Sequence, residues 1–232
     1  MGIIKTKGII LQESKMGDFD KMVTILTPSG KIGCAAKGAR KPKSLLMAGT
    51  QYFCFGEYLI FKSANSYNIN SCDTIEVFYN LRTDLDKLNY AVELCKIVEK
   101  VTYENQNTYR ILQLLLNTLY MISETDKNLE LIASVFRIRL LCLLGFMPNV
   151  KKCTRCDESV NIAFFSIADN GFKCINCGKV DKSAINISPT TVDAIRYIVT
   201  APAKKVFSFD LPEEAIKEIS LVSKVYLNEK IE

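Results

Sequence analysis

The chain has 232 residues, a formal net charge of +5, and 48% hydrophobic and 24% charged residues, as expected of a globular protein with a sizeable hydrophobic core. Histidine is absent, which excludes serine–histidine, cysteine–histidine and histidine–metal chemistry. No phosphate-binding loop of the G-x-x-x-x-G-K-[ST] type occurs, and no apolar run is long enough to span a bilayer. We therefore expect a protein that is not an enzyme.

The charge is distributed unevenly along the chain. Residues 1–80 hold ten Lys and Arg against six Asp and Glu, whereas the remainder holds twenty against nineteen. An excess of cations in one part of a protein indicates a site for a polyanion. We expect that site in the first third of the chain.

Residues 1–80 are predicted to form short strands, because apolar clusters alternate with turn signals. The expected strands are 8–11, 22–26, 32–36, 52–55 and 57–61, followed by 67–70 leading to 75–78. Five or so β-rich segments in eighty residues, with internal glycines at bends, favour a small closed barrel. The leading candidate for a five-stranded barrel of this size is the OB-fold.

A basic loop, residues 37–44, lies between the third and fourth expected strands. It contains four cations, Lys37, Arg40, Lys41 and Lys43, together with glycine and proline. Such cations neutralise phosphates, so we predict a DNA-binding loop; a loop that only aids solubility is the competing interpretation. Aromatic residues nearby would stack on unpaired bases or, more often, fill the barrel core. They are Tyr52, Phe53, Phe55, Tyr58 and Phe61.

Two D-x-D pairs raise the alternative of a metal-dependent nuclease. Asp18 and Asp20 flank a phenylalanine in a stretch with turn chemistry, and Asp84 and Asp86 fall in the expected first turn of a helix. Both pairs are therefore interpreted as structural.

Beyond residue 80 the apolar period changes to that of helices, with stripes over 81–102, 111–122 and 129–144. Arg137 and Arg139 leave the last stripe toward solvent or a groove. They are interpreted as surface charge or, alternatively, as part of a groove for a partner's amphipathic or acidic tail. Two further helices are expected near the C-terminus. One begins at Ser188-Pro189 with a capping serine and proline at its first position, and the other opens in the acid-rich stretch after Asp210.

Four cysteines form the most specific motif: Cys153, Cys156, Cys174 and Cys177. Two C-x-x-C knuckles turn their thiolates toward one point and supply the tetrahedral sulfur shell that zinc prefers. Asn170-Gly171 predicts a hairpin that returns the second knuckle to the first. Two disulfides or four unrelated thiols are the alternatives. The four sulfur ligands leave no open position, so the expected zinc ion is structural.

The other five cysteines are scattered in mostly apolar surroundings, which suits reduced core thiols and a cytoplasmic protein. Together the patterns predict an α+β multidomain chain. Its parts are an OB-fold barrel at 1–80, a helical domain at 81–150 and 184–232, and a zinc ribbon inserted at 151–183.

This arrangement resembles RecO, a bacterial family of DNA repair and recombination mediators. The resemblance covers nearly the whole chain and rests on several stretches in a fixed order. They are GIIL at 8–11, GDFDKMVT at 17–24, KGARKPKS at 37–44, QYFCFGE at 51–57, and RIRLLCLLGFMP at 137–148, followed by the first cysteine knuckle.

The resemblance implies a non-enzymatic DNA repair factor. Such proteins bind single- and double-stranded DNA and anneal complementary strands without ATP. They bind the acidic C-terminal tail of single-stranded-DNA-binding protein and, with RecR, help to load RecA onto coated strands. The resemblance also implies that Lys37, Arg40, Lys41 and Lys43 contact DNA, and that the four cysteines of the two knuckles bind zinc. Arg137 and Arg139 are the candidates for the tail site.

Two other interpretations stay open at this point. One is a general nucleic-acid-binding module with an OB-fold and a ribbon but no annealing activity. The other is an enzyme, such as a transferase, with a structural ribbon; the lack of histidine and of a phosphate loop argues against it.

Overall fold

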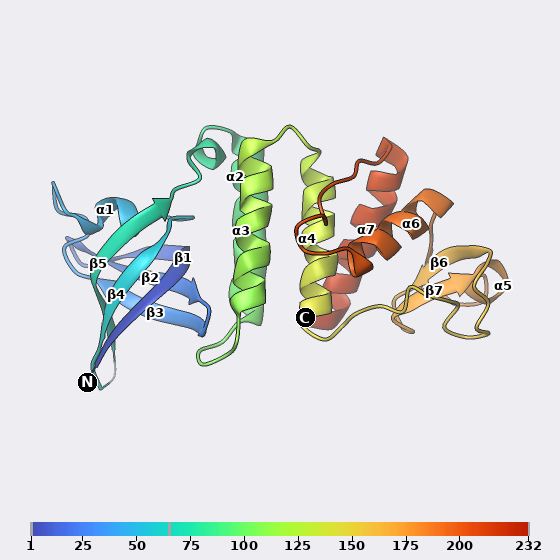
Figure 1. Cartoon of the computed structure of the whole chain (residues 1–232), viewed down its shortest axis with the longest axis horizontal. Helices are drawn as coiled ribbons and strands as arrows, with labels where there is room; N and C mark the ends of the chain where they lie inside the picture. Colours follow the sequence, from blue (N-terminus) through green and yellow to red (C-terminus); the bar gives the residue numbers. More distant parts are fainter. Residues whose placement is uncertain (1, 65, 232) are drawn as a thin grey trace. The chain divides into compact units, whose positions relative to one another are not determined.

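The computed structural model describes residues 2–64 and 66–231, and the chain divides into two compact units, Met1–Glu124 and Thr125–Glu232 (Figure 1). The first unit contains the predicted barrel and two long helices. The second contains three long helices and a small sheet that carries the cysteine motif. Within the described residues, no helix combines the length and the apolar character needed to cross a membrane.

The first unit begins with a closed five-stranded barrel in the order β1-β2-β3-β5-β4. Its strands are β1 (Gly2–Met16), β2 (Asp20–Thr27), β3 (Gly30–Ala36), β4 (Phe55–Lys62) and β5 (Tyr67–Glu76), with the one-turn helix α1 (Leu46–Gly49) between β3 and β4. The first half of β1 pairs with β4 and its second half pairs with β2, so this one long strand closes the barrel. The barrel predicted from the sequence, with the strand count of an OB-fold, is confirmed.

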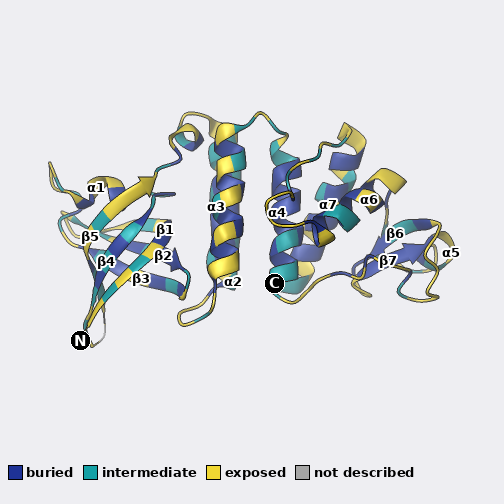
Figure 2. Cartoon of the chain, viewed as in Figure 1, coloured by how far each residue is buried: buried dark blue, intermediate teal, exposed yellow. Residues whose placement is uncertain are grey.

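The strands show the alternation expected of a sheet with one buried face. In β3, Ile32, Cys34 and Ala36 are buried while the intervening residues are exposed or half-buried, and β4 buries Tyr58 and Ile60 in the same way (Figure 2). Buried side chains from each of the five strands join in one apolar cluster. This core fixes the barrel and leaves the connecting turns to carry polar surface.

The structure differs from the sequence prediction at three places in the barrel. The first strand runs over Gly2–Met16, well beyond the expected 8–11. Residues 67–76 form one continuous strand, where two short strands were expected. Residues 51–54 form a turn, where a strand was expected: the amide of Cys54 donates to the carbonyl of Gln51, and Phe53 has a φ of 65°. Apolar composition favoured a strand there, but the backbone hydrogen bonds between Phe53 and Ile10 and between Ile10 and Cys54 hold the segment as a corner.

Two antiparallel helices, α2 (Leu85–Val101) and α3 (Tyr109–Glu124), complete the first unit after the short 3-10 turn η1 (Tyr79–Arg82). The segment between the two helices binds the β2–β3 turn. Lys31 donates its amide to the carbonyl of Tyr103 (3.0 Å), and Gly30 donates its amide to the hydroxyl of Thr108 (3.0 Å). Gly30 has a φ of +116°, and a Cβ there would lie 2.4 Å from the Tyr103 oxygen, so only glycine fits.

The second unit is built around α4 (Leu129–Leu143), which packs against α6 (Pro189–Thr200) and α7 (Glu213–Ile231). Ten of the fifteen residues of α4 are buried, so it is enclosed on nearly all sides. The starts of the helices follow their sequence signals. The Asp84 side chain accepts from two amides at the start of α2, and Ser188 caps α6 with Pro189 in its first turn.

The small sheet of the second unit has the order β7-β6-β8. It consists of β6 (Ile162–Ser166), β7 (Gly171–Cys174) and β8 (Ala184–Asn186), with the single-turn helix α5 (Ile175–Gly178) after β7. β6 and β7 are the predicted hairpin, whereas β8 was not predicted. The four-cysteine motif lies at the open end of this hairpin.

Candidate metal centre and nucleic-acid interface

The four cysteines of the two knuckles meet in one cluster. The sulfurs of Cys153, Cys156, Cys174 and Cys177 all lie within 4.8 Å of one another, and those of Cys156 and Cys174 are 3.6 Å apart. In a tetrahedral zinc site with Zn–S bonds of about 2.3 Å, the sulfurs are about 3.8 Å apart. All nine cysteines are free, and the other five include the buried thiols of Cys34, Cys54 and Cys95.

Backbone hydrogen bonds shape the first knuckle. The amide of Cys153 donates to the carbonyl of Glu158 (2.7 Å), and the amide of Asp157 donates back to the carbonyl of Cys153 (3.2 Å). The amide of Thr154 donates to the carbonyl of Phe172 in β7 (2.9 Å), which ties this knuckle to the strand that leads into the second one.

The second knuckle is formed by the end of β7 and the turn α5. The amide of Ile175 donates to the carbonyl of Asn161 (3.0 Å), which connects the knuckle to the segment before β6. Gly178 closes the knuckle beneath the Phe164 ring, where a Cβ would lie 2.2 Å from a ring carbon. The chain can pass under this ring only because residue 178 has no side chain.

The donor set fits zinc in its chemistry as well as its spacing. Burial raises the pKa of the Cys153 thiol, but hydrogen bonds from the backbone of Cys174, Arg155 and Cys156 outweigh it and lower the pKa to about 6. Its hydrogen bond with Cys156, together with burial, raises the pKa of Cys177 to about 12. Four convergent sulfurs with one readily ionised thiol suit a closed, structural zinc site with no position for a substrate.

A buried ion pair supports the ribbon beside the cluster. The Lys173 ammonium group lies 2.6 Å from a carboxylate oxygen of Asp169 and 2.5 Å from one of Asp181, and its side chain is almost completely buried. The hydrogen bonds from Lys173 and Ser166 hold the pKa of Asp181 below its usual range. The ribbon is therefore stabilised by a charged network in addition to its few apolar contacts.

Aromatic contacts fix the ribbon to the helices of its own unit. The Phe165 and Tyr226 rings meet edge to face with centroids 5.2 Å apart, and the Arg196 guanidinium lies 5.5 Å from the centroid of Phe172. Arg196 also donates to the carbonyl of Val150 (3.1 Å). The ribbon and the helices thus share one packed surface.

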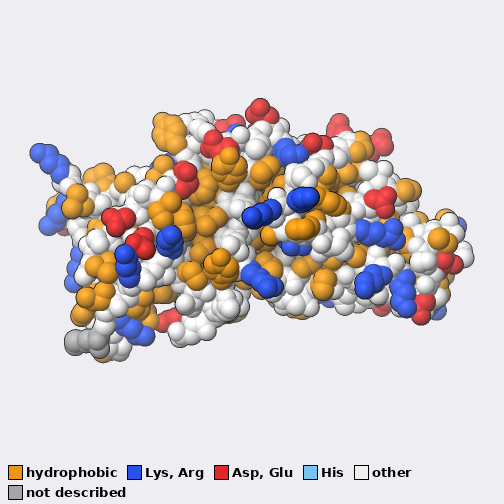
Figure 3. Space-filling view, viewed as in Figure 1, with side chains coloured by type: hydrophobic (Ala, Val, Ile, Leu, Met, Phe, Trp, Pro, Cys, Tyr) orange, Lys and Arg blue, Asp and Glu red, His pale blue; other side chains and the backbone are white. Residues whose placement is uncertain are grey.

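In the first unit, the basic loop lies between β3 and α1, as predicted. The side chains of Lys37, Lys41 and Lys43 are exposed, and Arg40 is half-buried. The Arg40 side chain donates to the carbonyl of Gly17 (3.2 Å), so part of its hydrogen-bonding capacity holds the β1–β2 turn. Figure 3 shows Lys and Arg side chains projecting from the end of the barrel where α1 lies. Their predicted contact with DNA stays a prediction.

The D-x-D pairs lie where the sequence predicts, at the β1–β2 turn and at the start of α2. Asp20 accepts a hydrogen bond from the amide of Gly38 (2.7 Å), which fastens the start of the basic loop to β2. Asp84 caps α2. Asp18 is exposed in the β1–β2 turn.

The aromatic residues named from the sequence divide by burial. Phe53 and Tyr58 are fully buried, and the Tyr58 hydroxyl donates to the carbonyl of Gly49 (2.8 Å), so these two rings belong to the core. Tyr52, Phe55 and Phe61 are half-buried. A more exposed ring, that of Phe19 at 51% exposure, was not singled out in the sequence as a ligand-binding residue. The sequence does contain a signal for Phe19, because a bulky apolar side chain is unusual in a turn of otherwise polar composition.

The two arginines of α4 have different surroundings. The expectation that both face solvent or a groove is wrong for Arg137, which is completely buried and bonded to Glu130 (2.9 Å). Its position excludes direct contact with a docked tail. Arg139 is half-buried and donates to the last carbonyls of α6, those of Ile198 (3.0 Å) and Val199 (3.1 Å). A role for Arg139 in binding a tail stays a prediction.

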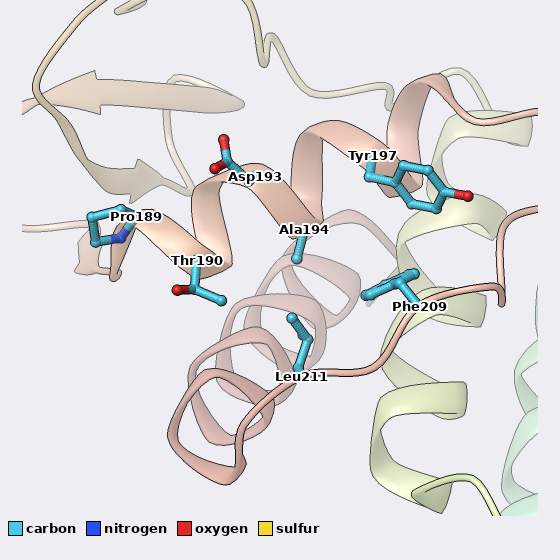
Figure 4. Close-up of a pocket in the computed structure, with 7 residues that line it drawn as sticks. All are labelled: Pro189, Thr190, Asp193, Ala194, Tyr197, Phe209 and Leu211. Carbon is cyan, nitrogen blue, oxygen red and sulfur yellow. The ribbon is translucent and has the colours of Figure 1, made fainter.

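A cavity of ≈ 380 Å³ lies beside α6 in the second unit (Figure 4). The residues that line it are Pro189, Thr190, Asp193, Ala194, Tyr197, Phe209 and Leu211. Tyr197 and Phe209 form an edge-to-face pair at one end, with centroids 5.2 Å apart. Among these lining residues only Asp193 is charged, so the cavity offers no cation for an acidic tail.

Fold and site together define a class of protein in which a barrel with a basic loop is combined with a helical unit that carries a four-cysteine ribbon. The family model described as Recombination protein O N terminal matches residues 1–78, and the model Recombination protein O C terminal matches residues 82–232. The chain belongs to the RecO family of DNA repair proteins.

Individual relatives agree with this assignment. The chain is 43% identical to the DNA repair protein RecO of Acetivibrio thermocellus over 234 residues, covering 100% of this chain and 93% of the relative. It is 34% identical to that of Alkaliphilus metalliredigens, covering 97% and 92%. It is 30% identical to that of Bacillus subtilis, covering 98% and 89%.

Proposed function

We propose that this chain is a non-enzymatic recombination mediator that binds single- and double-stranded DNA and anneals complementary strands without ATP. Its partners are RecR and the acidic C-terminal tail of single-stranded-DNA-binding protein, and its outcome is the loading of RecA onto coated DNA. Membership of the RecO family supports this proposal.

The basic loop is the observation that carries the proposal. Lys37, Lys41 and Lys43 are exposed, and no ion pair within the described residues engages them. Their charges are therefore available to phosphates. Two DNA strands repel each other through their phosphates, and a cationic surface that holds both lowers this repulsion and raises their local concentration.

Zinc has a supporting role in this proposal. Cys153, Cys156, Cys174 and Cys177 would hold the ion, which would join the two knuckles of the ribbon. Because all four positions are taken by sulfur, the ion supplies fold stability and no activated water.

The test is strand annealing in the absence of ATP. Two complementary oligonucleotides carrying a fluorophore and a quencher are mixed with the protein, and the annealing rate is followed by fluorescence. We expect the wild type to accelerate annealing, and the variant with Lys37, Lys41 and Lys43 changed to Ala to lose most of that acceleration. Arg40 is left in place because it also holds the β1–β2 turn.

A matched control removes three other exposed lysines of the same unit, Lys7, Lys96 and Lys100. It carries the same net charge as the basic-loop variant and should keep the wild-type rate. Annealing that is no faster with wild-type protein than without it would refute the proposal. Equal acceleration of DNA and RNA strands, with no binding to the tail peptide of single-stranded-DNA-binding protein, would favour a general nucleic-acid-binding module.

A further inference from the structure

Phe19 is an exposed aromatic residue in the β1–β2 turn, beside the basic loop. Half of its surface, 51%, is open to solvent. The buried aromatic residues of the barrel, Phe53 and Tyr58, are held in the core at 1% and 0% exposure. The Phe19 ring therefore lies outside the barrel core, with half of its surface free to contact a ligand.

Three contacts connect Phe19 and its turn to the basic loop. The amide of Arg40 donates to the carbonyl of Phe19 (2.9 Å), and the Arg40 side chain donates to the carbonyl of Gly17 (3.2 Å). The Lys41 ammonium group lies over the Phe19 ring, 5.7 Å from its centroid. The ring and the cations of the loop therefore form one surface within the first unit.

The charges around the turn indicate which part of a nucleic acid would lie on it. Asp18 is exposed beside Phe19 and would repel a phosphate, whereas the lysines of the basic loop would attract one. A DNA strand would therefore place its phosphates along the loop and a base over the turn. Proteins that bind single strands combine these same elements, a cationic track and aromatic rings on which bases stack.

We propose that Phe19 is a stacking site for an unpaired base of single-stranded DNA whose phosphates lie along the basic loop. This inference rests on the proposed function, since it assumes that the loop binds DNA. It adds a binding site for a base, formed by Phe19, which the distribution of charged residues alone does not indicate. Because both faces of a base inside a duplex are covered by stacked neighbours, the site selects single strands over duplex.

The chain contains no tryptophan, which permits a direct test. In the variant Phe19→Trp the new indole is the sole tryptophan fluorophore. We expect an oligothymidylate to quench its emission through stacking. A sugar–phosphate oligomer without bases should bind the loop but leave the emission unchanged. The control variant Tyr79→Trp replaces another exposed ring of the same unit, at 67% exposure, and should not respond to either.

Affinity measurements with labelled DNA provide a second readout. Phe19→Ala and Phe19→Leu should each weaken binding to single strands about fivefold or more, while Phe19→Tyr keeps it. The dependence of binding on salt should not change, because no phosphate contact is lost, and duplex binding should be unaffected. Leucine tests whether an aromatic plane is needed or only an apolar side chain.

Two results would overturn the inference alone. They are an unquenched Phe19→Trp variant that still binds labelled single strands, and a Phe19→Leu variant with wild-type affinity. In both cases the proposed function would stand. A wild-type protein that binds no single-stranded DNA would overturn both the inference and the proposed function.

Discussion

Arg137 and Arg139 are two residues apart on α4, yet the Arg137 side chain is buried and the Arg139 side chain reaches the C-terminal end of α6. Two residues correspond to a rotation of about 200° around a helix, so the side chains leave opposite faces. Arg137 points into the core of its unit, where Glu130 also accepts a hydrogen bond from Ser220 (2.8 Å). The pair thus connects α4 with α7. The Arg139 side chain donates hydrogen bonds to carbonyls at the C-terminus of α6, where the helix dipole favours a cation.

These positions predict different costs of substitution. Arg137→Ala should lower the free energy of unfolding by about 3 kcal/mol, because it empties a buried volume and leaves Glu130 without its enclosed cation. Arg139→Ala should cost about 1 kcal/mol, since Arg139 is half-buried and its removal lets water reach the carbonyls of Ile198 and Val199. Denaturant titration of both variants measures the difference. Equal and small effects would contradict the buried position of Arg137.

Glu218 on α7 predicts a dependence of stability on pH. Its carboxylate accepts hydrogen bonds from the amide (2.8 Å) and hydroxyl (2.7 Å) of Ser188 and from the hydroxyl of Thr191 (2.6 Å). Burial raises its pKa, but these hydrogen bonds outweigh burial and hold the pKa below its usual value of 4.5. The carboxylate therefore stabilises the fold fully above that value, and the contribution is lost as the pH falls through the lowered pKa.

We expect Glu218→Gln to lower stability by about 1 kcal/mol at neutral pH and to reduce the loss of stability on acidification below about pH 5. Thermal unfolding of both proteins between pH 3 and pH 7 measures this. Glu214→Gln is the control, since Glu214 is an exposed carboxylate on the same helix. Parallel curves for wild type and Glu218→Gln would show that the carboxylate gives no such stabilisation.

At the scale of elements, the ribbon is the segment that we expect to depend on a metal ion. Its three strands are short, and the two knuckles converge on one cluster of four sulfurs. We expect the purified protein to bind about one zinc ion per chain and Cys156→Ser to bind much less. Limited proteolysis should then cut the variant between residues 151 and 187. An uncut variant without zinc would show that the fold alone holds the ribbon.

Zinc loss should leave single-stranded DNA binding by the basic loop unchanged, because the cysteines and the loop lie in different compact units. Chelation of zinc from the wild type should give the same result as Cys156→Ser. A large loss of affinity in either case would place a DNA contact on the ribbon.

Most elements could be predicted from the sequence because their signals are local. The helix starts at Asp84 and Ser188 and the hairpin before Gly171 follow from capping and turn chemistry. The corner at Phe53 could not be predicted, since a φ of 65° is unusual for phenylalanine and is held by hydrogen bonds to the distant Ile10. The strand β8 was missed because three residues are too few for a periodic pattern.

The features of the candidate sites likewise divide into those that could be predicted from the sequence and those that could not. The cysteine cluster could be predicted because two knuckles of fixed spacing determine where their sulfurs meet. The burial of Arg137 could not, because an arginine on a helix that is enclosed on nearly all sides has the same local sequence as one on a surface helix. The contact of Lys41 with Phe19 depends on two loops that are separated by two strands.

For the whole molecule, the response of DNA binding to salt measures how many phosphates are held. Changing Lys37, Lys41 and Lys43 to Ala should flatten the slope of log affinity against log salt by about 2 on single strands, at about 0.7 per contact. The Lys7, Lys96 and Lys100 variant should keep the wild-type slope. An unchanged slope in the basic-loop variant would move the phosphate contacts to another surface.

The hydrogen bonds between the β2–β3 turn and the α2–α3 connection determine how the barrel can be isolated. A fragment that ends near residue 80 would lose Tyr103 and Thr108, the partners of Lys31 and Gly30. It would also uncover apolar surface that α2 and α3 share with the strands. A fragment that ends at Glu124 keeps all of these contacts. We therefore expect the smallest autonomously folding piece of this protein to be about half again as long as its barrel, with the two helices unfolding together with the strands.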